Sequence, residues 1–475
     1  MRTLFLQAPS FDGFDGGAGS RYQSKREIRS FWYPTWLAQP AALVPNSKLI
    51  DAPPHGISLA EVVAEAKNFD LAVLHTSTPS FASDVRAIAA LKAANPALKA
   101  GLIGAKAAVD AEGCLKSARI VDFAARNEFD FTIKEIADGK DWKSIRGLSF
   151  RDHNGEIRHT PDRTVLENMD ALPFVTPVYK RDLQISRYFI GYLRHPYISI
   201  YTGRGCKSRC TFCLWPQSVG GHRYRTRSVG HVIEEIAWAK RTFPEVKEFF
   251  FDDDTFTDDL PRAEAIAREL GKLGVVWSCN AKANVPRASL KAMRDGGLRL
   301  LLVGYETGNQ QILYNIKKGM RIDVAKRFTK DCRELGVTIH GTFIMGLPGE
   351  TQETIRETIA FAKEVNPHTL QVSLAAPYPG THLYKQALEN GWLDDANAEL
   401  VDENGVQMAP LHYPGLSHTE IFDSVETFYR SFYLRPAKIA SIVGEMVMSP
   451  DMMKRRLREG AEFFRFLRER RAAAH

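Results

Sequence analysis

Short apolar runs alternate with amphipathic stretches over the first third of the chain. Five of these runs predict buried strands: RTLFLQA, SKLIDA, LAVLHT, KAGLIGA and VDFA. Stretches such as LAEVVAEAKN and SDVRAIAALKAAN between them have the apolar spacing of helices. This order is typical of an α/β, doubly wound parallel sheet, which we predict over residues 1–146. Ligands of such sheets bind beyond the carboxyl ends of the strands, where Asp51, Thr76, Ser77 and Gly104 lie in this sequence.

A second alternating series follows a break in the pattern. Residues 147–197 predict a linker with a small hairpin around Asn154 and Gly155 and a proline-bearing connector. Six further strands are then predicted, in YISIYTGRG, KEFFFDDDT, VVWSCNAK, LRLLLVGYET, VTIHGTFIMG and TLQVSLAAP. Six strand–helix units predict a partial (β/α)6 barrel over residues 198–390, with catalytic groups at the carboxyl ends of the strands. Residues 391–475 predict a helical C-terminal region.

Composition narrows the class of protein. The 475 residues are 44% hydrophobic and 25% charged, as in a soluble globular protein. No apolar run approaches the roughly 18–20 residues of a membrane span, and Pro9 comes too early for a secretory signal, so we expect a cytoplasmic protein. The net charge of +7 is modest for this length and does not indicate a nucleic-acid partner.

The C-terminal sequence is strongly basic. Between Lys454 and Arg471 there are eight basic and three acidic residues, interleaved with Phe463, Phe464 and Phe466. A helix of this kind can lie on an anionic membrane surface, which would place the protein at the inner face of the membrane. The alternative is a solvated helix whose apolar stripe packs on its own domain.

Three cysteines lie within eight residues, directly after the first strand of the second series. The segment is Gly205-Cys206-Lys207-Ser208-Arg209-Cys210-Thr211-Phe212-Cys213, whereas Cys114, Cys279 and Cys332 are scattered. Thiolates are the usual ligands of iron–sulfur clusters, but a cubane has four ligand positions and the segment supplies three. Zinc with His222 as a fourth ligand is the alternative, and a redox dithiol would not need Cys206.

The C-x3-C-x2-C spacing resembles that of the radical S-adenosylmethionine (SAM) superfamily. In that family the amino and carboxylate groups of SAM chelate the iron that lacks a cysteine. An electron passed through the [4Fe–4S] cluster then releases methionine and a 5′-deoxyadenosyl radical. The resemblance implies that Cys206, Cys210 and Cys213 are catalytic cluster ligands. It also implies a cellular reductant of the flavodoxin or ferredoxin type.

Further motifs add to this resemblance. Gly304-Tyr305-Glu306 resembles the Gly-Gly-Glu element that binds the SAM amino group, with Tyr305 in place of the middle glycine. Phe212 resembles the aromatic residue that lines the adenine side of the loop. GTFIMGLPGET, which contains Gly346, and APYPGT resemble fifth- and sixth-strand motifs of the branch that includes methylthiotransferases and cobalamin-binding members. Glycine and proline there permit close backbone approach to the nucleoside.

Three acids end the second strand of this series at the catalytic rim. Asp252 and Asp254 are candidates for contacts with substrate hydroxyls or amines, as is Asp253 between them. The alternative is a solvated strand end.

A doubly wound domain before a radical SAM core resembles the cobalamin-binding branch, so a Rossmann-like, cobalamin-binding-type domain is expected. Cobalamin domains often coordinate cobalt through the histidine of a D-x-H-x-x-G motif. Here Asp51-Ala52-Pro53-Pro54-His55-Gly56 has proline at that position, and His55 is displaced by two residues. The resemblance implies cobalamin contacts from Asp51, Gly56, Thr76 and Gly104. The alternative is a vestigial domain that binds substrate or only packs.

The opening segment SFDGFDGGAGSRYQSKREIRSFWYPTWLAQPAALV resembles hopanoid-associated radical SAM proteins of the bacteriohopanetetrol cyclitol ether synthase group. That resemblance implies a hopanoid glycoside substrate, whose glucosamine ring is contracted to a cyclitol ether. One rival is a cobalamin-dependent radical methyltransferase acting on an unactivated carbon. Another is an iron–sulfur or cobalamin sensor without catalysis. A methylthiotransferase acting on transfer RNA is disfavoured, because only Cys114 lies in the first domain.

Overall fold

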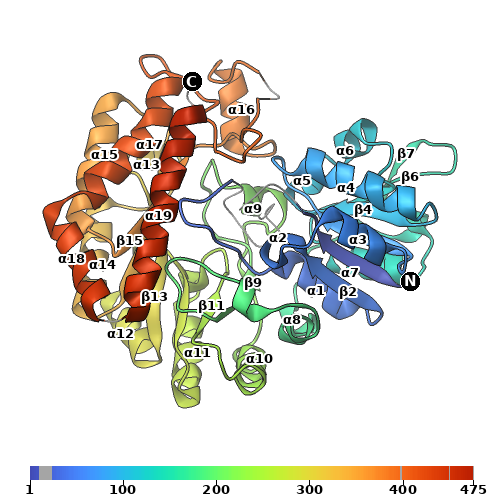
Figure 1. Cartoon of the computed structure of the whole chain (residues 1–475), viewed down its shortest axis with the longest axis horizontal. Coiled ribbons are helices and arrows are strands. Elements are labelled where there is room, and N and C mark those ends of the chain that lie inside the picture. The colour runs from blue at the N-terminus through green and yellow to red at the C-terminus, as the bar shows by residue number, and fades with distance from the viewer. Residues whose placement is uncertain (10–23, 396–397, 449, 474–475) are drawn as a thin grey trace.

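Two β-sheets lie side by side, and helices at the C-terminus pack against the second (Figure 1). The computed structural model describes residues 1–9, 24–395, 398–448 and 450–473. Part of the distinctive opening segment, residues 10–23, lies outside the described residues. No helix of the described chain is long and apolar enough to span a bilayer.

The first sheet contains the five predicted parallel strands in the order β2-β1-β3-β4-β5. Their bounds are β1 Thr3–Gln7, β2 Ser47–Asp51, β3 Leu71–His75, β4 Lys99–Ile103 and β5 Phe123–Ala125. The predicted hairpin forms as β6 (Leu148–Arg151) and β7 (Ile157–His159), and it pairs antiparallel on β5. The first sheet therefore extends beyond residue 146, into the segment predicted as a linker.

Helices cover both faces of the first sheet, which explains why its central strand β3 is buried along its whole length. They are α1 Thr35–Leu43, α2 Ala52–His55, α3 Leu59–Ala66, α4 Phe81–Ala94, α5 Ala105–Val109, α6 Ala111–Ser117 and α7 Asp130–Ala137. Alternate side chains enter two separate cores. Leu74 packs in a core of the first domain, whereas Val73 belongs to a core that continues into the second sheet.

The second sheet consists of six parallel strands in the order β8-β11-β12-β13-β14-β15, as the six predicted units require. They are β8 Tyr197–Ile200, β11 Glu248–Phe251, β12 Trp277–Ala281, β13 Leu298–Glu306, β14 Thr338–Met345 and β15 Thr369–Leu374. The surrounding helices are α8 Thr176–Asp182, α10 Val229–Thr242, α11 Leu260–Leu273, α12 Arg287–Asp295, α13 Gln310–Asn315, α14 Ile322–Glu334, α15 Gln352–Val365 and α16 His382–Glu389. Because β8 and β15 do not pair, the barrel is open between its first and last strands.

The outer edge of β15 is covered by side chains rather than by another strand. Helix α17 (His418–Tyr433) places the hydroxyls of Tyr433 and Tyr429 where they accept from the backbone N–H groups of Leu370 and Val372, at 2.9 and 2.8 Å. The last two helices, α18 (Pro436–Met448) and α19 (Pro450–Ala473), complete the predicted helical region. Hydrogen-bonding groups that an edge strand would expose are thereby satisfied.

A buried ionic cluster joins the first domain to the barrel. Arg204 donates two hydrogen bonds to Asp130, at 2.6 and 3.1 Å, and Arg225 donates two to Glu128, at 2.8 and 2.6 Å. All four side chains are at most 5% exposed. Arg204 ends β9 (Gly203–Arg204), which pairs with β10 (Arg225–Thr226), and it directly precedes residues 205–213, the cysteine loop. The first domain therefore fixes the position of β9, the strand that leads into this loop.

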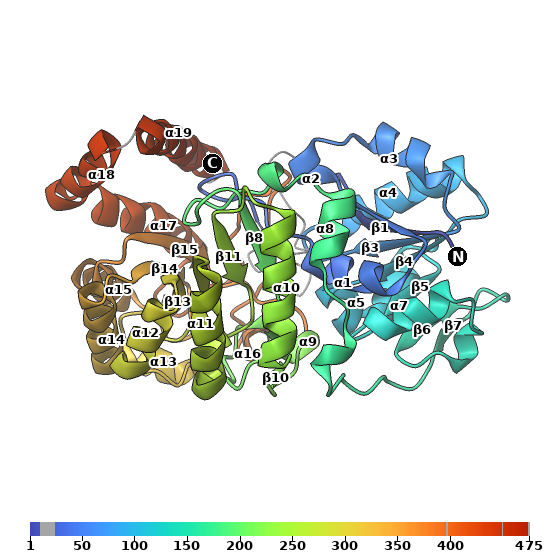
Figure 2. The ribbon, with the colours of Figure 1, turned by 90° about the horizontal axis from the view of Figure 1, so that it is seen from below.

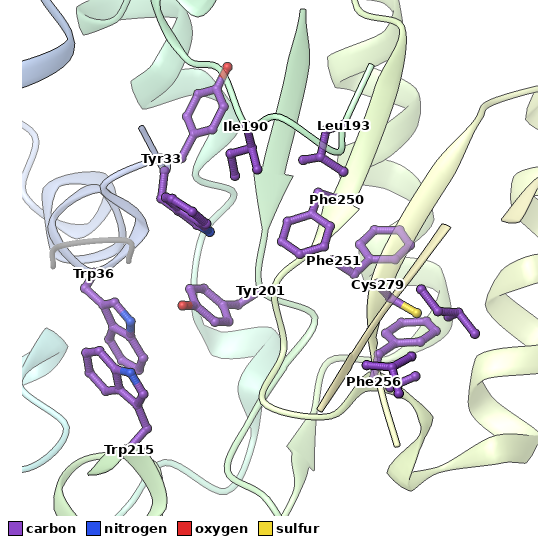
Figure 3. Close-up of a cluster of buried hydrophobic side chains, with 14 of the residues drawn as sticks. Tyr33, Trp36, Ile190, Leu193, Tyr201, Trp215, Phe250, Phe251, Phe256 and Cys279 are labelled. Carbon is purple, nitrogen blue, oxygen red and sulfur yellow. The ribbon is translucent and has the colours of Figure 1, made fainter. Parts of the chain in front are cut away.

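Stacked tryptophans lie beside the ionic cluster. Trp36 of α1 and Trp215 of α9 (Leu214–Ser218) have ring centroids 5.2 Å apart and planes inclined by only 4°, and Figure 3 shows Tyr201 beside them. The Arg204 guanidinium lies over the Trp36 ring, 4.8 Å from its centroid. Aromatic stacking and a desolvated cation thus hold the domains together at one place.

Replacing Arg204 with methionine should destabilise the fold strongly, because the Asp130 carboxylate stays buried without its direct cation. The free energy of unfolding in urea should fall by about 3–5 kcal/mol. Arg223→Met is the matched control, since Arg223 pairs with Glu167 on the surface. It should change the same quantity by about 0–1 kcal/mol. Equal losses for the two variants would contradict the role assigned to the buried cluster.

Candidate active site

The cysteine loop is clamped along one side by carboxylates that follow β11. Asp254 accepts a hydrogen bond from the backbone N–H of Gly205 at 2.9 Å, and Asp258 accepts one from Lys207 N–H at 3.1 Å. Gly205 has a φ of +90°, and a Cβ there would lie 2.2 Å from the carbonyl oxygen of Arg223. The turn into the cysteines therefore requires glycine.

The opposite side of the loop is held by one amide. Gln217 donates to the carbonyl oxygens of Cys210 and Cys213, at 3.2 and 2.6 Å, and also approaches that of Thr211. Thr211 in turn donates its N–H to Ile316 O at 3.0 Å. Contacts on both sides fix the loop backbone, so the three thiols start from a preorganised arrangement.

The thiols themselves lie in a poorly solvated site. Cys206 and Cys210 are 7% and 8% exposed, and Cys213 is half-buried. The Sγ of Cys206 lies 3.4 Å from the hydroxyl of Thr255 and accepts from the backbone N–H of Ser208 at 3.4 Å. Burial raises the pKa of the Cys210 thiol, whereas the nearby Lys318 ammonium lowers it. Hydrogen bonds to sulfur and nearby cations are the means by which proteins tune an iron–sulfur site.

The spacing of the thiols favours a cluster over zinc. Tetrahedral zinc, with Zn–S bonds of about 2.3 Å, would bring its sulfur ligands within about 4 Å of one another. Within the part of the chain that the structure describes, the three thiols do not belong to any set of three ligand atoms within 4.8 Å of one another. His222, the alternative fourth ligand, bonds through Nδ1 to Ser208 O at 2.8 Å, an arrangement that leaves its Nε2 available and does not itself exclude ligation. A cubane, whose irons are spread over a larger body, suits this set of donors.

An ion pair stands next to the thiols at the carboxyl end of β13. Glu306, which is 5% exposed and has a φ of +64°, accepts a hydrogen bond from the Lys318 ammonium. Burial alone would lower the pKa of Lys318, but the charges of Glu306 and Cys210 raise it on balance. A Cβ on Gly304 would lie 2.3 Å from the Glu306 carboxylate, so glycine leaves room for the pair. One fixed positive and one fixed negative charge thus face the cysteines.

The loop after β14 contains a second buried carboxyl group. Gly346, with a φ of +84°, donates its N–H to Glu350 and accepts from the Tyr413 hydroxyl at 2.7 Å. Burial raises the pKa of Glu350 to about 8, although the N–H groups of Gly346 and Leu347 oppose the shift. At neutral pH this carboxyl is therefore mostly protonated, and it holds the loop as a neutral group.

The three acids after β11 and Phe212 have different surroundings. Asp252 is 3% exposed and accepts from the Asn280 amide at 3.1 Å, so it is not a solvated strand end. Asp253 is fully buried and accepts from Thr202 N–H and the Tyr224 hydroxyl, both at 2.5 Å. Asp254 holds the loop, as described above, and Phe212 packs against the continuous core. Substrate contact stays a prediction for Asp252, whereas the geometry of Asp254 is that of a positioning residue.

The residues predicted to hold cobalamin divide into two groups. Thr76 and Gly104 follow the central strands β3 and β4, and both lie beside His75. Asp51 ends the edge strand β2 and Gly56 follows it, and the Asp51 carboxylate accepts from the Tyr188 hydroxyl at 2.7 Å. Asp51 pairs in register with the last residue of β1, so β1 alone separates it from β3, and cobalamin contact by the second group stays a prediction.

Both ring nitrogens of His55 are used in hydrogen bonds to other parts of the backbone. Its Nε2 accepts from Gln184 N–H at 3.0 Å, and its Nδ1 lies 2.8 Å from Asp51 O. His55 therefore joins the first domain to the connector and does not replace a cobalt ligand.

Two further polar side chains were not predicted at the carboxyl ends of the central strands. Gln7 ends β1 and His75 ends β3, the two strands between which the connections change direction. Neither side chain has a hydrogen-bond partner among the described residues, although both are buried. Burial lowers the pKa of His75 to about 3, so its ring is neutral. The ring centroid lies 6.4 Å from that of Trp215, two residues after Cys213.

The geometry agrees with similarities to known proteins. A family model described as the radical SAM superfamily matches residues 200–362. An uncharacterized methyltransferase of Pyrococcus horikoshii is 30% identical over 424 residues, which are 87% of this chain and 90% of the relative. The chain belongs to the radical SAM superfamily.

Two other similarities extend over nearly all of this radical SAM protein. The anaerobic magnesium-protoporphyrin IX monomethyl ester cyclase of Rubrivivax gelatinosus is 25% identical over 458 residues, 92% of this chain and 78% of the cyclase. The solved structure of the radical S-adenosylmethionine methyltransferase TsrM from Kitasatospora setae, with cobalamin and a [4Fe–4S] cluster bound, has a TM-score of 0.68. It covers 99% of both chains at 15% identity. The likeness to TsrM shows a common fold, and it confirms the predicted order of doubly wound domain, partial barrel and helical C-terminal region.

Membership of the radical SAM superfamily confirms the predicted use of SAM and an iron–sulfur cluster. Two contributors to the site were missed in the sequence. Lys318 lies twelve residues after Glu306 in a basic pair, which was its only signal. The sequence gives no signal for Gln217, because its contacts with three backbone carbonyl groups depend on how the loop folds.

Lys318→Met should weaken SAM binding by the radical SAM protein at least tenfold, because the variant has no ammonium to pair with the SAM carboxylate. A buried charge-assisted contact of this kind is worth roughly 1.5–3 kcal/mol. Equilibrium binding of SAM to anaerobically reconstituted protein measures this effect. Cluster content should stay unchanged, since Lys318 is not a thiolate ligand. Lys317→Met, at the exposed neighbour, is the control and should bind SAM normally. Equal affinity for both variants would contradict the role of Lys318.

Glu350→Gln should change how stability depends on pH. A carboxyl whose pKa is about 8 in the folded state and near 4.5 when unfolded makes stability fall as the pH rises between these values. The neutral amide does not ionise and retains an acceptor for Gly346 N–H. The melting temperature of the variant should equal that of the wild type near pH 4.5 and exceed it near pH 8. Glu353→Gln, at an exposed site, should follow the wild type throughout, and parallel profiles for all three proteins would contradict the assignment.

Proposed function

We propose that this radical SAM protein is a cobalamin-dependent methyltransferase. The observation that carries the proposal is that the candidate cluster site and the candidate cobalamin site adjoin. Trp215, two residues beyond Cys213, lies beside His75 at the carboxyl end of the first sheet. Transfer between two bound groups requires such proximity. The Pyrococcus horikoshii relative is named as a methyltransferase, and the structure of TsrM contains both cobalamin and the cluster.

In this proposal, Cys206, Cys210 and Cys213 hold three corners of the [4Fe–4S] cluster. When bound, the cluster supplies the electron that cleaves the sulfonium of SAM to methionine and a 5′-deoxyadenosyl radical. Glu306 binds the amino group of SAM, and Lys318 pairs with its carboxylate. Both charges are buried, so they orient SAM in a medium where water screens little.

The first domain fits cobalamin through its unpaired buried polar groups. Gln7 and His75 provide donors and acceptors without partners among the described residues, and Gly104 adds no side chain beside them. The neutral ring of His75 keeps a nitrogen lone pair that can accept a hydrogen bond or bind a metal. When bound, cobalamin supplies a carrier for the methyl group. Thr76 remains a candidate contact beside His75, and Asp51 and Gly56 lie farther away, at the end of the edge strand β2 and just beyond it.

Ring contraction of a hopanoid glycoside is the second candidate. It rests on the similarity of the opening segment, and the Rubrivivax gelatinosus relative is named as a cyclase, so ring chemistry occurs among similar proteins. None of the relatives reported above carries a hopanoid in its name. A radical at a sugar carbon would permit the skeleton to rearrange, which acid–base chemistry at an unactivated carbon does not.

Reconstitution without oxygen, with iron, sulfide, cobalamin, SAM and dithionite, tests the proposal. Wild-type protein should release 5′-deoxyadenosine. Cys206→Ala, Cys210→Ala and Cys213→Ala should each abolish its release, because each removes a ligand of the cluster. Cys114→Ala is the matched control, since Cys114 is buried in the first domain, and it should retain activity. A wild-type protein that releases none would indicate a sensor.

SAM with a deuterated methyl group distinguishes the two candidates. A methyltransferase should produce S-adenosylhomocysteine and place the labelled methyl group in a metabolite supplied from extracts of a deletion strain. A ring-contracting enzyme should form 5′-deoxyadenosine without S-adenosylhomocysteine. The deletion strain should then accumulate hopanoid glucosamine and lose the cyclitol ether.

A further inference from the structure

Helices α18 and α19 expose an unusual number of large apolar side chains. Ile439, Val443 and Val447 on α18 are 44%, 49% and 82% exposed, and Leu457 and Phe464 on α19 are 59% and 58% exposed. We call these residues, together with Met453, the outer face. Both views place α18 at the end of the molecule remote from the first domain (Figure 2).

The exposed residues follow the helical repeat. Ile439, Val443 and Val447 are four residues apart and therefore form one stripe along α18. On α19, Leu457 and Phe464 are seven residues apart and share one side of the helix. The two helices pack on each other, so the stripes make a continuous surface.

Cations accompany the apolar stripe of α19. At 100° per residue, Lys454, Arg465 and Arg468 fall with Leu457 and Phe464 in an arc of about 100°. The three cations are exposed and make no ion pair among the described residues. The acids of α19 whose side chains the structure describes all fall outside this arc; they are Glu459, Glu462 and Glu469.

Three residues of the outer face also line a cavity. The cavity has a volume of about 290 Å³ and lies between α17, α18 and α19 and the amino ends of β14 and β15. Its lining includes Ile439, Val443 and Phe464 of the outer face together with Tyr192 and His340. The cavity is thus at the end of the barrel opposite the cysteine loop.

We propose that the outer face docks on the anionic surface of a lipid bilayer. Apolar side chains of this size would enter the region between headgroups and acyl chains, while the arginines and the lysine meet lipid phosphates. A second copy of the chain fits poorly, because a two-fold contact would bring like charges together with no acid to match them. The proposal does not depend on the chemistry of the active site.

Vesicle flotation with the anaerobically purified full-length protein tests the proposal. The probes are vesicles of phosphatidylcholine alone and vesicles that also contain phosphatidylglycerol. The protein should float with the anionic vesicles and less with the neutral ones, and added salt should release it. Replacing Lys454, Arg465 and Arg468 with glutamine should weaken binding about fivefold for each cation, on the order of 100-fold in total.

Two further variants separate the contributions of charge and apolar surface to vesicle binding. Glutamine at Lys272, Lys330 and Lys385, three exposed lysines outside the outer face, is the matched charge control and should bind like the wild type. Leu457→Ser with Phe464→Ser should lose binding to both kinds of vesicle while keeping cluster absorbance. Absence of binding by the wild type, or equal loss in the charge control, would overturn the proposal. Dimers that the Leu457→Ser, Phe464→Ser variant abolishes, without vesicle binding, would assign the face to a second copy instead.

Discussion

The buried contact of Arg204 and Arg225 with Asp130 and Glu128 is the interaction on which the rest of the structure depends. Charges removed from water are stable only when each has a partner with good geometry, so the two domains fit in one relative position. Arg204 is also the residue before the cysteine loop. The position of the first domain is consequently transmitted to the first thiol, that of Cys206, through one intervening residue, Gly205.

The cysteine loop is held in the same manner on its other sides, by groups that belong to different elements. Asp254 and Asp258 come from the segment after β11, and Gln217 comes from α9. Glu306 lies at the end of β13, and Lys318 lies just after α13. The contacts of Asp254 and Asp258 span 49 and 51 residues, so the loop is fixed on that side only once β11 has joined the barrel, whereas the contacts of Gln217 and Lys318 are local in sequence. Such preorganisation lets fixed charges act on a bound ligand without further rearrangement.

Local pattern was sufficient to predict the strands, because parallel strands covered on both faces are continuous apolar runs such as LAVLH. The cysteines and Glu306 were found through their spacing and sequence neighbours. Asp254 was assigned to substrate, because its bond to Gly205 N–H depends on how β11 and β9 lie in space. The distance between Asp51 and Thr76 could not be predicted for a similar reason: strand order, which the sequence does not state, puts β1 between their strands. His75 and Gln7 gave no signal, since an unpaired polar group is recognisable only after its surroundings are known.

The coverage of β15 by Tyr429 and Tyr433 has a consequence for biosynthesis of the chain. Until α17 has been synthesised and has folded back, the last strand presents bare amide groups that could pair with another nascent polypeptide. Ribosome-bound intermediates ending before residue 418 would therefore be the ones most in need of a chaperone. Helix α17, which protects this edge, is synthesised after every strand of the barrel.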